Sequence, residues 1–173
     1  LSAPSGGGKS SLARALVDRV EDTVISVSHT TRPQRTGEAH GVDYFFVDQP
    51  EFEQMIKDDG FLEYARVFDH WYGTSRKAVE QAIVQDRSVM LDIDWQGARQ
   101  VRRAFPGAVS VYILPPSVEA LAQRLADRGR DTPDEIASRL SEAASEMSHY
   151  DEYDQILINT NFDAALGELE ALV

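Results

Sequence analysis

A glycine-rich segment near the start of the chain constrains the fold more than any other feature. Residues 3–10 read Ala-Pro-Ser-Gly-Gly-Gly-Lys-Ser, and apolar residues follow at helical spacing over 12–20. Because glycine adopts positive φ easily, these glycines can turn backbone N–H groups toward one point at the helix N-terminus, where they would bind an anion. Lys9 can reach the β- and γ-phosphates of a nucleotide, and the Ser10 hydroxyl can bind Mg²⁺. The segment therefore predicts a phosphate-binding loop, although the usual pattern opens with glycine where this chain has Ala3.

The composition limits the classes of protein that remain. With 173 residues, 42% hydrophobic and 27% charged, the chain is long enough for one globular α/β domain. The net charge of −12 argues against a protein that binds nucleic acid or an anionic membrane, because both need a broad basic surface. The absence of cysteine excludes disulfides and thiolate chemistry and fits a reducing compartment, so we expect a cytoplasmic protein. Leu1 and Ser2 resemble the end of a buried strand, which predicts further residues upstream.

Strand-like and helix-like segments alternate along the chain. This order predicts an α/β fold with a parallel central sheet covered by helices on both faces. We expect the strands at 24–27, 88–93, 109–114 and 156–158, and the helices at 51–57, 96–105, 118–127, 133–147 and the C-terminus.

Two stretches interrupt this alternation. Residues 29–74 contain the strand-like segments 44–47 and 61–65 and are too long for a plain crossover, so we predict a small inserted subdomain. Residues 124–139 are rich in Arg and Asp and lie between two helices, which is typical of a lid. The remaining residues, 1–28, 75–123 and 140–173, are expected to form the core domain.

The predicted subdomain begins with a second candidate phosphate site. Arg32 and Arg35 flank Pro33, and Tyr44 follows closely. Two guanidinium groups and a phenol suit a phosphate monoester, although a solvated Arg-rich loop would have the same sequence. Further on, Glu63 lies on an apolar strand, where its carboxylate is either exposed at a sheet edge or half-buried against a ligand.

Two aspartates follow an apolar strand in the segment Leu91-Asp92-Ile93-Asp94-Trp95-Gln96-Gly97. Asp92 ends the strand, the usual place for a carboxylate that orders Mg²⁺ and its waters opposite a phosphate loop. Asp94 leaves the same face two residues later. Asp94 and Gly97 also satisfy the Asp-x-x-Gly pattern of GTP switches, but the chain has no Asn-Lys-x-Asp or Thr-Lys-x-Asp motif to read the base, which argues against a GTPase.

With these motifs in order, the chain resembles the guanylate kinase family over essentially its whole length. The resemblance depends on four separated blocks: 5–11, 30–35 through Tyr44, 72–74 and 91–97. It implies a three-layer P-loop kinase fold with an inserted GMP-binding subdomain and a helical lid. The implied activity is transfer of the γ-phosphoryl group of ATP to GMP, and to dGMP as well, with Mg²⁺. Nucleotides are the expected partners, with no nucleic acid, membrane or obligate protein partner.

The resemblance also implies a role for each matching residue. The guanine would lie among Ser28, Glu63, Thr74 and Asp94, and the GMP phosphate would bind Arg32, Arg35, Tyr44 and Tyr72. ATP and Mg²⁺ would be held by Ser5, Gly6, Gly7, Gly8, Lys9, Ser10 and Ser11, with Asp92 acting on Mg²⁺ through water and Asn159 at the adenine. The expected catalytic residues are Lys9, Arg32, Arg35 and the lid arginines Arg128 and Arg139.

One related class of protein has the same overall resemblance without the activity. Guanylate-kinase-like modules of membrane-associated scaffolds bind phosphorylated peptides, and their phosphate loops are characteristically damaged. This chain keeps Lys9, Ser10, Asp92 and both lid arginines. The sequence therefore favours the kinase over a non-catalytic phosphopeptide-binding module.

Overall fold

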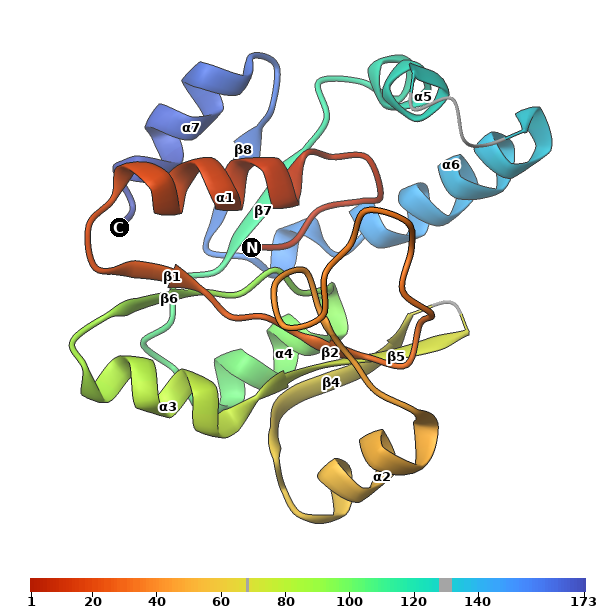
Figure 1. The fold of residues 1–173 in the computed structure, drawn as a ribbon. Coiled ribbons are helices and arrows are strands. Elements are labelled where there is room, and N and C mark those ends of the chain that lie inside the picture. The colour runs from red at the N-terminus through yellow and green to blue at the C-terminus, as the bar shows by residue number, and fades with distance from the viewer. Residues whose placement is uncertain (68, 128–131) are drawn as a thin grey trace. The chain divides into compact units, whose positions relative to one another are not determined.

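The structure, a computed structural model, describes residues 1–67, 69–127 and 132–173. The chain forms two compact units (Figure 1). The first contains Leu1–Glu21 and Val109–Val173, and the second contains Asp22–Ala108.

The first unit pairs its N-terminal segment with a parallel strand pair. Strand β7 (Val111–Leu114) lies parallel to β8 (Gln155–Ile158), and Ser2 forms a further parallel bridge to Tyr112. Helix α1 (Lys9–Arg19) follows the glycine-rich loop and buries Leu12, Ala13 and Leu16. Helix α7 (Phe162–Glu170) packs against α1 and is held to it by a 3.0 Å ion pair between Arg19 and Glu170.

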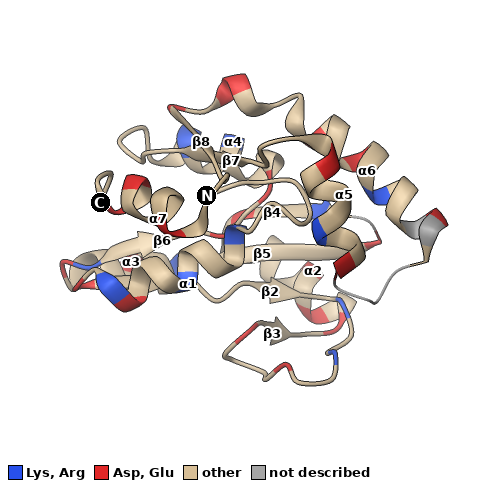
Figure 2. Cartoon of the chain, turned by 90° about the horizontal axis from the view of Figure 1, so that it is seen from above, with Lys and Arg blue, Asp and Glu red and all other residues tan. Residues whose placement is uncertain are grey.

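Two helices and a short 3₁₀ turn complete the first unit. Helix α5 (Val118–Asp127) packs on α6 (Pro133–Met147) through Leu121, Leu125 and Ala143, and the 3₁₀ turn η1 (Tyr150–Glu152) leads to β8. Figure 2 shows acidic residues along α6. The apolar side of α6 therefore faces α5 while charged residues lie on its other sides.

The second unit contains a parallel pair and a four-stranded sheet. Strand β1 (Thr23–Ile25) lies parallel to β6 (Ser88–Met90), and helix α3 (Arg76–Val84) precedes β6. The larger sheet has the order β3-β2-β5-β4, made of Phe45–Phe46, His29–Thr30, His70–Ser75 and Phe61–Val67. Its strands are antiparallel except for the β2–β3 pair. Helix α4 (Trp95–Ala104) packs on β4.

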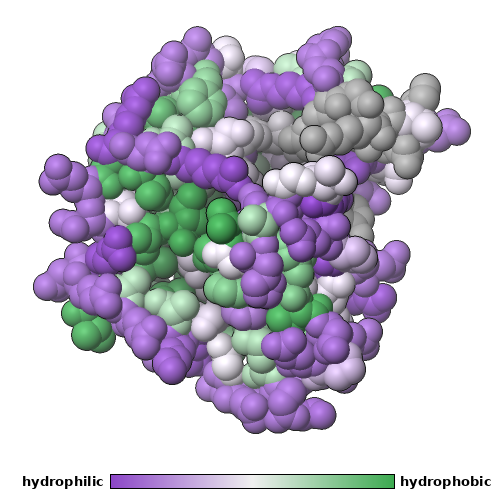
Figure 3. Space-filling model, in the orientation of Figure 1, coloured by the Kyte–Doolittle hydropathy of each residue, from purple (hydrophilic) through white to green (hydrophobic). Residues whose placement is uncertain are grey.

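Aromatic packing joins helix α2 (Gln49–Lys57) to the four-stranded sheet. Phe52 is fully buried, stacks on Phe61 with ring centroids 4.4 Å apart, and lies 6.0 Å from the Trp71 ring. Asp48 caps α2 by accepting a hydrogen bond from the Glu51 N–H. Hydrophilic side chains surround the exposed side of this helix in Figure 3. The helix is thus fixed by one large buried ring and a polar cap.

The α/β class predicted from the sequence is confirmed, with differences in individual elements. The strand predicted over 88–93 ends at Met90, because residues 91–94 leave the sheet to reach the cap of α4. Helix α3 was not predicted, although Ser75 caps it and Val79 is its buried residue. Strand β8, predicted at 156–158, begins one residue earlier, and its Ile156 and Ile158 side chains are 46% and 55% exposed. In the described part of the chain, no helix has the length and apolar character needed to cross a membrane.

Candidate functional site

The glycine-rich loop of the first unit has the backbone of an anion site. Gly6 and Gly8 have φ of 89° and 95°, values that favour glycine, and the Gly7 N–H donates to the Pro4 carbonyl at 2.9 Å. Gly8 is the N-cap of α1, so Lys9 and Ser10 begin the helix. A Cβ on Gly7 would lie 2.9 Å from the Ala3 Cβ, so the side chain that departs from the usual pattern packs against the loop. Residues 3–10 therefore form a glycine-shaped turn that leads into α1, and phosphate binding by this turn stays a prediction.

Two side chains from distant parts of the first unit hold this loop in place. Asn159, buried beyond the end of β8, donates from Nδ2 to the Gly7 carbonyl at 3.0 Å, and a Cβ on Gly8 would lie 2.6 Å from the same nitrogen. Glu146, near the end of α6, accepts a 3.1 Å hydrogen bond from the Ser5 N–H. Burial and the Glu146 charge raise the pKa of Tyr112, so that phenol is protonated at neutral pH. Asn159 and Glu146 therefore each hold the loop backbone through one hydrogen bond.

Arg124, in the last turn of α5, extends this support. Its Nη2 donates to the Asn159 carbonyl at 2.8 Å. Its Nη1 is buried, and none of the described residues gives it a hydrogen-bond partner. The helix that leads into the predicted lid is therefore linked to the loop through Asn159.

In the second unit, Arg32 lies at the centre of a polar and aromatic group that we name the Arg32 cluster: Arg32, Glu38, Tyr44 and Tyr72. Arg32 Nη2 forms a 2.7 Å ion pair with Glu38 Oε1, and the guanidinium lies 5.4 Å from the Tyr44 ring centroid. The Tyr44 and Tyr72 rings are 5.9 Å apart in an edge-on arrangement. Burial alone would lower the pKa of Arg32, but the Glu38 and Tyr72 oxygens raise it, so the guanidinium stays charged.

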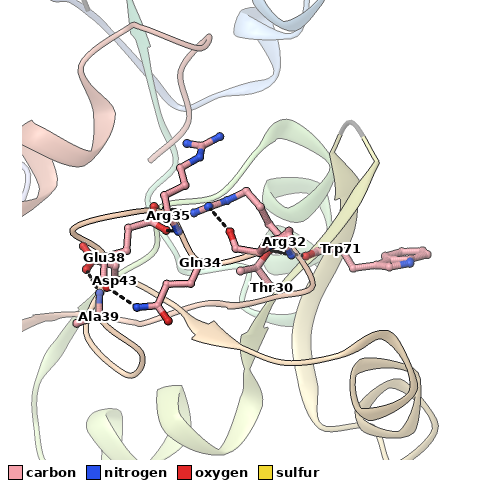
Figure 4. A network of polar contacts seen from close by, with 9 residues as sticks. Thr30, Arg32, Gln34, Arg35, Glu38, Ala39, Asp43 and Trp71 are labelled. Atoms are coloured by element: carbon pink, nitrogen blue, oxygen red, sulfur yellow. Dashed lines mark hydrogen bonds and ion pairs between the residues drawn. The ribbon is translucent and has the colours of Figure 1, made fainter. Parts of the chain in front are cut away.

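Glu38 also holds the loop that carries Arg35. Its Oε2 accepts a 2.8 Å hydrogen bond from the Arg35 N–H (Figure 4). The hydrogen bond from Arg32 holds the pKa of Glu38 below its usual range. The Arg35 side chain is exposed and extends away from Glu38 in Figure 4. The structure therefore brings Arg32, Tyr44 and Tyr72 together, while Arg35 is exposed and contacts Glu38 through its backbone N–H.

Glu63 is buried in β4, which decides between the two environments left open by the sequence. The residue is only 4% exposed, and its Oε1 accepts a 2.5 Å hydrogen bond from Thr74 Oγ1 on the neighbouring strand. Glu63 and Thr74 are direct partners in the β4–β5 register, which has an irregularity between Phe61 and Glu63. In the neighbouring antiparallel β2–β5 pair, His29 pairs with Gly73. Ser28, the buried residue just before β2, therefore lies near Thr74, the residue just after Gly73.

Asp94 approaches the same region from the start of α4. It is the N-cap, and its Oδ1 accepts from the Gly97 N–H at 2.9 Å while Oδ2 accepts from Gln96 Nε2 at 2.8 Å. Gly97 also lies against Glu63, because a Cβ there would be 2.2 Å from Glu63 Oε2. Two carboxylates, one from a strand and one from a helix cap, thus meet at Gly97. Asp92 is partly buried two residues beyond β6 rather than at its last residue.

Of the two predicted lid arginines, Arg139 lies within α6 and is partly buried. Arg128 lies outside the described residues. Among residues 1–67, 69–127 and 132–173, no three His, Asp or Glu side chains gather into a metal-binding group. A bound metal ion would therefore take some of its ligands from substrate or water rather than from three such side chains of the described residues.

Sequence reasoning missed four residues that shape these sites: Glu38, Gly97, Arg124 and Glu146. The three-residue spacing from Arg35 to Glu38 was the available signal for a loop-closing carboxylate. No local pattern marks Glu146, because its partner Ser5 is 141 positions away.

His29 packs against aromatic side chains of the second unit. Its ring stacks on Phe45 at 4.7 Å, and its buried Nδ1 has no hydrogen-bond partner among the described residues. Burial and the neighbouring His40 lower the pKa of His29. The ring is therefore neutral at physiological pH and acts in packing.

Comparisons with known proteins bear on the whole chain. The family described as guanylate kinase matches residues 1–173. A guanylate kinase of Methylococcus capsulatus is 57% identical over 173 residues, which are all of this chain and 85% of the relative. A guanylate kinase of Escherichia coli is 53% identical and is covered over 84% of its length.

A solved structure gives the same result for the fold. The crystal structure of guanylate kinase from Anaplasma phagocytophilum has a TM-score of 0.82 and 35% sequence identity, covering 99% of this chain and 80% of that one. The P-loop kinase fold predicted from the sequence is confirmed by this similarity.

Proposed function

This chain belongs to the guanylate kinase family, and we propose on that basis that it transfers the γ-phosphoryl group of ATP to GMP, and to dGMP, giving ADP and the nucleoside diphosphate. The observation that carries this proposal is the pair of carboxylates of Glu63 and Asp94 at Gly97, next to the Thr74 hydroxyl.

The carboxylate pair suits guanine and not adenine. Guanine has two adjacent donors, N1–H and the exocyclic amine, which carboxylate oxygens accept well. Adenine has an acceptor at N1 and no amine at C2, so it would place an acceptor against the carboxylate oxygens and offer them no donor on that edge. We assign the guanine to Ser28, Glu63, Thr74 and Asp94. The Ser28 hydroxyl would donate to O6, because the Thr74 hydroxyl already donates its hydrogen to Glu63.

We assign the GMP phosphate to Arg32, Arg35, Tyr44 and Tyr72. Arg32 is 8% exposed, and its ion pair with Glu38 supports the assignment, because the guanidinium already binds one anionic group in a partly desolvated position. The exposed Arg35 would have to turn toward the phosphate. A phosphate monoester carries close to two negative charges at neutral pH, and Arg32 alone does not neutralise both. The remaining charge would attract the Arg35 guanidinium.

We assign the triphosphate of ATP to the loop of residues 5–11, with backbone N–H groups and the Lys9 side chain as ligands. The Ser5 and Gly7 N–H groups would first have to leave Glu146 and the Pro4 carbonyl. The positive φ values of Gly6 and Gly8 support this assignment, because they shape the loop without any ligand. Asn159 is assigned to the ATP half of the site as well. Its hydrogen bond to the Gly7 carbonyl supports a contribution through the loop, and a direct contact with adenine stays a prediction.

Mg²⁺ would be held by the Ser10 hydroxyl and, through water, by Asp92. Both are oxygen donors, which Mg²⁺ prefers, and Mg²⁺ usually takes its other ligands from substrate phosphates and water. The absence of a carboxylate cage among the described residues fits this mode of binding. When bound, the ion would neutralise charge on the β- and γ-phosphates.

The reaction needs no general base from the protein. The acceptor is a phosphate oxygen of GMP that is already ionised, so catalysis consists of in-line positioning and charge neutralisation. Lys9, Arg32, Arg35 and Arg139, together with Arg128 outside the described residues, are the proposed charge-neutralising groups. No histidine is assigned a role.

The proposed division of labour follows the predicted regions. Residues 29–74 would bind GMP, 124–139 would form the lid, and 1–28, 75–123 and 140–173 would form the core. The four-stranded sheet, which runs from His29 to Ser75, supports the first of these. The substrates and the absence of cysteine fit action in the cytoplasm.

A direct test measures ADP release from ATP with GMP, AMP, CMP and UMP as parallel acceptors. We expect GMP to be used at least a hundredfold better than AMP in kcat/KM, because a buried hydrogen-bonding site rejects a mismatched partner strongly. Equal use of all four acceptors would contradict the guanine assignment. Absence of turnover with intact phosphopeptide binding would favour a non-catalytic module.

A further inference from the structure

Gly97 occupies a position in which no other residue fits the observed structure. It is the third residue of α4 and is buried. A Cβ on Gly97 would lie 2.2 Å from Glu63 Oε2, 3.0 Å from Cδ and 3.4 Å from Cγ. Carbon and oxygen atoms that are not bonded stay more than 3 Å apart, so any side chain here must displace the Glu63 carboxylate or the helix.

The backbone of Gly97 does not itself require glycine. It is not among the glycines with positive φ, which are Gly6, Gly8, Gly37 and Gly41. Glycine is less favourable than alanine within a helix. Glycine at this position is therefore unfavourable for the helix itself. The close approach of the Glu63 carboxylate gives the physical reason why glycine is needed here.

The Glu63 carboxylate has little room to move away. The residue is 4% exposed, its Oε1 accepts from Thr74 Oγ1 at 2.5 Å, and its strand packs against α4. Gly97 also donates its N–H to Asp94 Oδ1 at 2.9 Å. One glycine therefore touches both carboxylates, Glu63 through its missing side chain and Asp94 through its backbone.

We propose that Gly97 is the positioning residue for guanine selectivity: its missing side chain provides the space in which the Glu63 carboxylate sits beside Asp94. This inference rests on the proposed function, since it assigns Glu63 and Asp94 to guanine. With alanine at this position, Glu63 Oε2 would have to move from 2.2 Å to an ordinary contact of about 3.4 Å from Cβ. A displacement of about 1 Å is enough to lower the rate of a positioned reaction by about a hundredfold.

The test is the variant Gly97→Ala, assayed with the natural chain for kcat and for KM of GMP and ATP separately. We expect kcat/KM for GMP to fall by about a hundredfold, with KM for ATP within about twofold, because the displaced carboxylate lies in the proposed guanine site and not at the phosphate loop. Gly167→Ala is the matched control, since Gly167 is also helical and a Cβ there meets nothing within 4 Å. It should leave both KM values unchanged.

A second variant separates positioning from general packing. Glu63→Asp shortens the side chain by one methylene and withdraws the carboxylate from Gly97. In the natural chain it should lower GMP use, whereas in the Gly97→Ala background it should restore part of the lost kcat/KM for GMP. A structural role alone would give additive losses and a lower melting temperature in the double variant.

The outcomes distinguish this inference from the proposed function. A natural chain that does not phosphorylate GMP would overturn the proposed function, whatever the variants do. A natural chain active on GMP, with Gly97→Ala equally active or with equal losses for ATP and GMP, would overturn only the role of Gly97.

Discussion

The phosphate loop and the Arg32 cluster both suit a phosphate group, but they are built from different atoms. The loop presents backbone N–H groups, whose directions follow from the positive φ of Gly6 and Gly8. The Arg32 cluster presents side chains, and Glu38 already occupies its guanidinium at 2.7 Å. The loop backbone is shaped by its glycines and the Arg32 cluster by side-chain contacts, but in both sites a phosphate would compete with a carboxylate: Glu146 at the Ser5 N–H and Glu38 at Arg32.

This difference determines how each site responds to change. Backbone N–H groups do not titrate, so the loop depends on Lys9 for its mobile charge and on Asn159 and Glu146 for its position. The Arg32 cluster depends on the charge of Glu38, whose pKa is lowered by the hydrogen bond from Arg32. We therefore expect loop variants to affect ATP and phosphoryl transfer, and variants of the second unit to affect GMP.

The largest effect is expected at the loop. Lys9→Met should lower kcat by about a thousandfold or more, because it removes a positive charge from the developing transition state while keeping an aliphatic side chain. The melting temperature should change little, since Lys9 is only partly buried. Steady-state kinetics check this, with Lys77→Met on the exposed face of α3 as the control. Near-normal turnover would show that the loop does not perform the chemistry.

The next effect is expected at Glu63. In Glu63→Gln, one oxygen can still accept from Thr74, so the new NH₂ group would face the donors of guanine. We expect kcat/KM for GMP to fall by about a hundredfold or more, with ATP binding unchanged. Glu53→Gln, on the exposed side of α2, is the matched control. If ATP binding fell and GMP kinetics survived, Glu63 would belong to the other nucleotide.

The phosphate loop and the proposed guanine site differ in how much of each can be predicted from the sequence. The loop is one continuous segment with fixed residue types, so its residues can be assigned from the sequence alone. The proposed guanine site combines Ser28, Glu63, Thr74 and Asp94 across 67 positions, and from residue patterns alone Glu63 could have been exposed. Only the β4–β5 register, with its irregularity before Glu63, brings Thr74 against it. The resemblance supplied the assignment that local pattern could not.

The same physical limit explains the missed elements and contacts. Asp92 was expected at the end of a strand, but the chain leaves the sheet after Met90 so that Asp94 can cap α4. Capping by Asp94 depends on Gly97, only three residues away, whereas the loop contact of Glu146 joins residues 141 positions apart. Long-range polar contacts such as that of Glu146 have no local signal, whereas the Ser75 cap of α3 was a local signal that was missed.

A smaller effect is expected for the arginine of α6. Arg139→Ala should lower kcat about tenfold or more and change ATP affinity less, if the guanidinium meets the phosphates mainly in the transition state. Arg19→Ala, which removes an exposed arginine paired with Glu170, is the control and should leave kcat unchanged. Equal losses in kcat and ATP affinity would indicate ground-state binding instead.

Asn159→Ala tests whether the loop depends on its side-chain support. Loss of the hydrogen bond to the Gly7 carbonyl would leave a buried acceptor unpaired, so we expect KM for ATP to rise about tenfold while KM for GMP stays constant. The rise should be the same for GTP as phosphoryl donor, because the effect acts through the loop. An effect confined to ATP would support the adenine contact.

The control is Asn161→Ala, which removes the cap of α7. It should lower the free energy of unfolding by about 1 kcal/mol without changing KM for ATP or for GMP.

The smallest effect is expected at Glu38, where the comparison becomes a pH dependence. The pKa of Glu38 is lowered by the hydrogen bond from Arg32, so its ion pair stabilises the folded state at pH values above the ordinary carboxyl pKa of about 4.5. This stabilisation is lost as the pH falls through the lowered pKa, because protonation removes the charge. Glu38→Gln should therefore melt a few degrees below the natural chain at pH 7, and this difference in melting temperature should close toward pH 3.

The control is Asp69→Asn, which removes an exposed ion pair with Arg66. It should melt at almost the same temperature as the natural chain at either pH. A difference for Glu38→Gln that persisted at pH 3 would mean that the shape of Glu38, and not its charge, holds the Arg32 cluster.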